Sequence, residues 1–92
     1  MQGAEAESVA IQALGWLAGE EELLMAFLAA SGAGVNDVRE MADDPAFLGA
    51  VLDFILLSDD HVRGFCDSAG LSYETPMRAR QSLPGGEQVN WT

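Results

Sequence analysis

Residues 44–57, DPAFLGAVLDFILL, set the architecture of this chain. Asp44 is a residue type that accepts hydrogen bonds from the first N–H groups of a helix. Pro45 needs no N–H at the first helical position. Apolar residues then follow on almost every side, with Asp53 as the interruption. Because a helix that is apolar nearly all round is typical of a domain centre, we expect the central helix here.

Working outward, the chain shows further apolar runs of helical period, separated by glycine, proline or acidic turns. No run alternates strictly between apolar and polar residues, so no strand is expected. Residue types suited to helix boundaries are the N-caps Asn36, Ser58 and Thr75 and the C-terminal glycines Gly19, Gly32 and Gly70. The pattern predicts an all-α bundle of about six helices, over residues 7–18, 20–31, 36–42, 45–57, 59–69 and 76–83.

The length of 92 residues, 49% of them hydrophobic, fits one compact domain and excludes intrinsic disorder. We expect that domain over residues 1–83, followed by a C-terminal tail, 84–92, that carries Trp91. A single cysteine, Cys66, cannot form an internal disulfide. No apolar run reaches the roughly 20 residues of a membrane span, and the N-terminus lacks the features of a secretion signal. These features predict a soluble, cytoplasmic protein without a membrane partner.

The two halves of the chain resemble one another when the sequence is shifted by 38 positions. Leu14 then falls on Leu52, and Phe27 falls on Phe65. Each half reads as a long helix, a second long helix ended by glycine, and a short helix. This predicts two similar three-helix units related by an approximate two-fold, with helices 7–18 and 45–57 packed together.

The net charge of −11, with no lysine at all, excludes direct nucleic-acid binding. Most of the acids stand just before or within the first turn of an expected helix, where carboxylates interact with unpaired N–H groups and the helix dipole. That placement favours a role in helix starts and solubility. A competing hypothesis is an acidic mimic that sequesters a basic or nucleic-acid-binding protein.

The only grouping that suggests catalysis or metal binding is Asp59, Asp60 and His61 followed by Cys66. His61 and Cys66 are five residues apart, about 140° around a helix, so they do not share a face. We expect Cys66 to point into the core and His61 to lie at its edge. The sequence therefore predicts no catalytic residue, no metal site and no cofactor, and the protein is not expected to be an enzyme.

Asp53 is unusual because it interrupts the most apolar helix. An unpaired buried charge is costly, so the side chain is expected to reach solvent or to pair with Arg78 or Arg80. The functional alternative is that these three residues are the polar contacts of a small-molecule pocket or an enzyme site.

Met25, Ala26 and Ala29 form the outer face of the helix expected over residues 20–31. The corresponding face of helix 59–69 carries Arg63 and Asp67, spaced for an ion pair. The contrast suggests that the apolar face is covered by a second copy, by another protein or by Trp91 of the tail, although simple exposure remains an alternative. The favoured function is a non-enzymatic protein–protein interaction or regulatory module.

Several strings together resemble a family of short, helical alphaproteobacterial proteins classed as a domain of unknown function. They are AESVAIQAL at 6–14, DPAFL at 44–48, VLDF at 51–54, FC at 65–66, and AR at 79–80 through LPGG at 83–86. The resemblance covers all but the last six residues. It implies a stand-alone, all-helical protein with no assigned activity, cofactor or catalytic residue.

Overall fold

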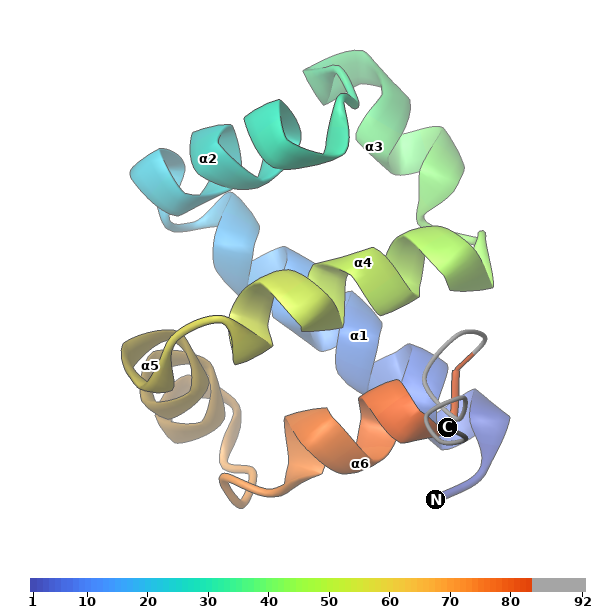
Figure 1. The fold of residues 1–92 in the computed structure, drawn as a ribbon, viewed down its shortest axis with the longest axis vertical. Helices are drawn as coiled ribbons and strands as arrows, with labels where there is room; N and C mark the ends of the chain where they lie inside the picture. The colour runs from blue at the N-terminus through green and yellow to red at the C-terminus, as the bar shows by residue number, and fades with distance from the viewer. Residues whose placement is uncertain (84–92) are drawn as a thin grey trace, which may run out of the picture.

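The computed structural model describes residues 1–83, which form six α-helices joined by short turns (Figure 1). In chain order they are α1 (Gly3–Ala18), α2 (Glu21–Ser31), α3 (Val35–Met41), α4 (Pro45–Leu56), α5 (Asp59–Ala69) and α6 (Thr75–Gln81). No strand occurs in these residues, so the predicted all-α class is confirmed. The tail, 84–92, lies outside the described residues.

Helix α4 lies at the centre of the molecule, as its apolar sequence predicts. It packs against α1, α2, α5 and α6. Figure 1 shows it crossing in front of α1, with α2 and α3 on one side and α5 and α6 on the other. Val51, Leu52 and Ile55 of α4 are fully buried. Ala10 and Ala13 of α1 are also fully buried, and such small side chains allow two helices to approach closely.

Aromatic rings join the outer helices to this centre. Phe27 of α2 packs edge-on against Phe47 and Phe54 of α4, with 5.6 Å between ring centroids in both pairs. Trp16 of α1 packs against Phe65 of α5 at 6.2 Å. Tilted and edge-on pairs are the favourable geometries for aromatic contacts, so these rings fix how α2 and α5 sit on the α1–α4 pair.

Four predicted helix boundaries are confirmed in atomic detail. The side chain of Asp44 accepts a hydrogen bond from the Ala46 N–H at 3.0 Å, and that of Ser58 accepts one from the Asp60 N–H at 3.1 Å. Gly32 and Gly70 end α2 and α5 in the left-handed conformation, with φ of 77° and 72°. Glycine suits both positions because it has no Cβ to clash there.

Gly19 ends α1, as predicted, but its φ of −87° shows that it does so without a left-handed turn. Two predicted N-caps are wrong. Asn36 lies inside α3, whose N-cap is Gly34. Thr75 is the first residue of α6 and not its cap, because the preceding Glu74 already has helical dihedral angles. Backbone hydrogen bonds close the turn at Gly19. At the start of α3 the Asp37 carboxylate accepts from the Gly34 N–H at 3.1 Å, and before α6 the Ser72 and Thr75 hydroxyls bond to each other at 2.9 Å.

The start of the first helix also differs from its predicted position. Helix α1 begins at Gly3, four residues before the expected start at residue 7. The N–H of Gln2 donates to the Glu5 carboxylate at 3.4 Å, and the Ser82 hydroxyl donates to the Met1 carbonyl at 2.8 Å. The first contact is local to the start of α1, and the second joins the end of α6 to it.

The predicted contact between the first long helices of the two halves is present, since α1 and α4 pack extensively together. The third helices differ in their surroundings. Helix α6 packs closely against both α1 and α4, whereas α3, within the described part of the chain, makes no comparably extensive contact with any helix. The two-fold relation of the halves therefore stays a prediction.

Candidate functional site

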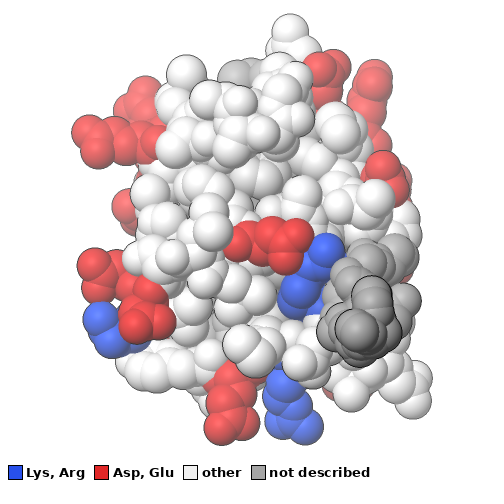
Figure 2. Space-filling view, in the orientation of Figure 1, with Lys and Arg blue, Asp and Glu red and all other residues white. Residues whose placement is uncertain are grey.

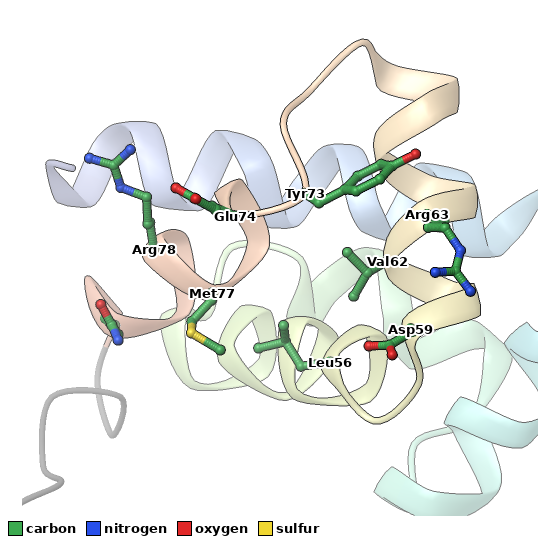
Figure 3. A pocket seen from close by; sticks show the side chains of 9 residues that line it. Leu56, Asp59, Val62, Arg63, Tyr73, Glu74, Met77 and Arg78 are labelled. Carbon is green, nitrogen blue, oxygen red and sulfur yellow. The ribbon is translucent and has the colours of Figure 1, made fainter.

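The largest hollow described, about 450 Å³, lies between α5, α6 and the end of α4 (Figure 3). Its lining combines an apolar floor with charged ends: Leu56, Asp59, Val62, Arg63, Tyr73, Glu74, Met77, Arg78 and Gln81. Figure 3 shows the apolar side chains in the middle, with Asp59 and Arg63 toward one end and Glu74 and Arg78 toward the other. Both signs of charge therefore flank the same apolar floor.

The charged groups at one end are held by neighbouring side chains. Arg63 donates to Asp60 at 3.0 Å, and both groups are largely exposed, so the pair adds little stability. The predicted Arg63–Asp67 pair is therefore wrong. Asp67 accepts instead from the Tyr73 hydroxyl at 2.7 Å, and this hydrogen bond raises the pKa of Tyr73. It ties the α5–α6 connection to α5.

The predicted polar cluster is formed in part. Arg80 donates from Nε and Nη2 to the two carboxylate oxygens of Asp53, at 2.6 and 3.1 Å. The Arg80 guanidinium lies over Gly49 of α4, where a Cβ would come within 2.9 Å of Nη1. A glycine one turn before Asp53 thus makes room for the arginine.

Arg78 does not join this pair. It lines the α5–α6 hollow, whereas Asp53 lines a different one, of about 210 Å³, between α2 and α4. The three residues expected around one ligand are therefore divided between two surfaces. Arg80 binds both carboxylate oxygens of Asp53. An ion pair with one of the two arginines is one of the structural outcomes expected from the sequence.

The side chains of His61 and Cys66 make different contacts and do not form a shared site. The His61 ring stacks on Phe54, with 5.2 Å between centroids, and its Nδ1 lies 3.3 Å from the Phe54 carbonyl oxygen. Cys66 is buried, as predicted, and its thiol donates to the Ser72 carbonyl at 3.3 Å. Burial and the nearby Asp67 carboxylate raise the pKa of Cys66, so the thiol form is favoured. Residues 1–83 contain no group of three or more His, Cys, Asp and Glu placed to hold a metal ion.

The outer face of α2 is exposed where the sequence places it. Met25 is 57% exposed, and Ala26 and Ala29 are also exposed. Trp91, the fourth residue assigned to this surface, lies outside the described residues. Figure 2 shows that the area over α2 is mostly uncharged, with the acidic side chains mainly around its edges.

Sequence reasoning missed the apolar residues around the largest hollow. Leu57, Tyr73 and Met77 are 78%, 51% and 54% exposed. Tyr73 and Met77 line this hollow, whereas Leu57 lines the hollow of about 210 Å³ between α2 and α4. The available signal was the spacing of Tyr73 and Met77, two large apolar residues four positions apart among polar neighbours.

A family model matches residues 3–86, nearly the whole chain. Its description is a protein of unknown function, DUF3572. No significant match was found to a curated protein or to a solved structure. No helix within residues 1–83 is long and apolar enough to cross a membrane. An all-helical chain matched over this length by one family model belongs to the DUF3572 family of proteins of unknown function.

Proposed function

We propose that the protein is a non-enzymatic protein–protein interaction module whose contact surface is the outer face of α2. The observation that carries this proposal is the charge-free stretch Leu23–Ser31 in a chain with 15 acidic residues. Met25, Ala26 and Ala29 lie exposed on that stretch. Small side chains allow a partner helix to approach closely, and the flexible methionine adapts to the shape of the partner.

The comparison with α5 supports this assignment. Its outer face carries Arg63 and Asp67, which are held by Asp60 and Tyr73. Such polar pairs are suited to contact with water. The same surface of α2 offers water no charged group, and an exposed apolar face in an acidic protein is typical of an interaction site.

The absence of an enzymatic role is proposed from the state of the reactive groups. The Asp53 carboxylate is occupied by Arg80, and the Cys66 thiol is buried with a raised pKa. Neither group is prepared to act as a base or a nucleophile, because both tasks need an accessible, unoccupied side chain.

The first partner to test is a second copy of the chain. We expect sedimentation velocity to show concentration-dependent dimerisation of the full chain, which Ala29→Glu abolishes by placing a charge in the contact. Ser68→Glu is the matched control, because Ser68 is exposed on α5. A chain that stays monomeric at every concentration, with both variants unchanged, would contradict self-association through α2.

The salt dependence of binding separates this proposal from the acidic-mimic hypothesis. Two chains of charge −11 repel one another, so added salt strengthens an apolar dimer by screening that repulsion. An acidic mimic bound to a basic partner loses affinity steeply as salt rises. Binding that weakens with salt would therefore favour the mimic.

A further inference from the structure

A third hollow, of about 330 Å³, lies where α1, α2 and α3 meet. Its lining is apolar except for one arginine: Leu14, Ala18, Leu24, Leu28, Val38, Ala42 and Arg39. Leu14 and Leu28 are buried core residues, so the floor of the hollow is the core itself. The volume is at the lower end of the range for small-molecule sites, about 300–1,000 Å³.

Arg39 is the one charged residue in the lining of this hollow. Two of the four arginines, Arg63 and Arg80, pair with carboxylates. Arg39 has no hydrogen bond or ion pair to any residue within 1–83, although the chain contains 15 acids. An unpaired guanidinium beside an apolar floor is suited to a ligand with a hydrocarbon body and a planar anionic end.

The α5–α6 hollow is less suited to an anionic ligand. Its Arg78 is likewise unpaired within residues 1–83, but Asp59 and Glu74 share the lining and repel an anion. No carboxylate lines the hollow beside Arg39.

We propose that the hollow between α1, α2 and α3 binds a small apolar carboxylate. The hydrocarbon part lies among Leu14, Leu24 and Leu28, and the carboxylate pairs with Arg39. Helix α3 packs less extensively on its neighbours than α6 does, so it is the element best able to adjust around a ligand. This site is separate from the outer face of α2, because Leu24 and Leu28 line it from the inner side.

The test is an NMR titration of the isotope-labelled full chain with octanoate, with octanamide as the neutral probe of the same shape. We expect saturable shifts at the end of α1, in α2 and in α3. Octanamide is expected to bind at least about tenfold more weakly, because a charge-assisted hydrogen bond contributes at least that factor.

Variants locate the site. Arg39→Gln is expected to weaken octanoate binding about tenfold, whereas Arg78→Gln, at the other unpaired arginine, leaves it unchanged. Both arginines are exposed, so both variants are expected to fold. Ala18→Phe places a ring in the hollow and is expected to abolish binding of both probes.

Several results would overturn the proposal. They are the absence of saturable binding, equal affinity for octanoate and octanamide, or shifts that gather on α5 and α6. Octanoate binding that appears only in the Trp91→Ala variant would assign the hollow to the chain's own tail, and would overturn it too.

Discussion

Gly64 of α5 and Gly49 of α4 are positions where the absence of a side chain matters to the fold. A Cβ on Gly64 would lie 2.8 Å from Cζ2 of Trp16, and one on Gly49 would lie 2.9 Å from the Arg80 guanidinium. The arginine can move aside because it is the end of a flexible chain. The indole ring packs against Phe65 and has less freedom to move. Neither glycine has a positive φ, so close approach and not backbone freedom explains both.

We therefore predict that Gly64→Ala lowers the free energy of unfolding by about 1 kcal/mol. Overpacking against Trp16 costs about 1–3 kcal/mol, and the better helix propensity of alanine offsets about 1 kcal/mol of that loss. Urea denaturation measures the difference. Gly15→Ala is the control, because Gly15 lies in α1 with nothing within 4 Å of its Cβ position, so this change is expected to stabilise by about 0.5–1 kcal/mol. A loss of stability in the control, or a gain for Gly64→Ala, would contradict this account.

At the scale of the helices, a residue of N-cap type caps a helix only where its side chain reaches one of the first backbone N–H groups. Ser58 and Asp44 do so, at 3.1 and 3.0 Å. Asn36 has the same chemical capacity, but it lies within α3 and caps nothing. Acidic residues occupy the first turns of α1, α2, α3 and α5. That placement agrees with their proposed role at the positive ends of helix dipoles.

The capping difference predicts unequal costs for two similar changes. Ser58→Ala removes the hydrogen bond to the Asp60 N–H and is expected to lower the unfolding free energy by about 1 kcal/mol. Asn36→Ala removes no cap and is expected to change it by less than about 0.5 kcal/mol. Thermal or urea unfolding of both variants measures the contrast. Equal losses would show that Asn36 acts as a cap in solution.

At the scale of the whole molecule, α4 joins most of the other helices into one packed unit. It packs against α1, α2, α5 and α6, and its Leu52 is fully buried. A single central helix leaves no half of the chain with a core of its own. Small domains of this kind unfold in one transition.

Leu52→Ala is accordingly expected to cost about 2–5 kcal/mol while unfolding remains a single transition. Far-ultraviolet and near-ultraviolet circular dichroism should give the same midpoint. Leu57→Ala is the control, because Leu57 is 78% exposed and its truncation should change stability by less than about 0.5 kcal/mol. Separate midpoints for the two signals would show that the halves unfold independently.

Much of the fold was predictable because its signals are local. The spacing of apolar residues, the Asp44–Pro45 start and the glycines after α2 and α5 act within a few residues of one another. Asn36 and Thr75 were misassigned as caps. The Asp37 carboxylate accepts from the Gly34 N–H at the start of α3, and α6 follows Glu74, which already has helical dihedral angles. The Asp53–Arg80 pair was predictable as one of two options. The choice of Arg80 over Arg78 needed the position of α6 over Gly49.

By itself, the sequence determined the helical class, the central place of α4 and the exposed apolar face of α2, because these follow from residue periodicity along single helices. Only the tertiary structure decided which arginine meets Asp53, where hollows remain between helices and which charged groups line them. Those features depend on contacts between residues far apart in the chain, and no local pattern encodes their geometry.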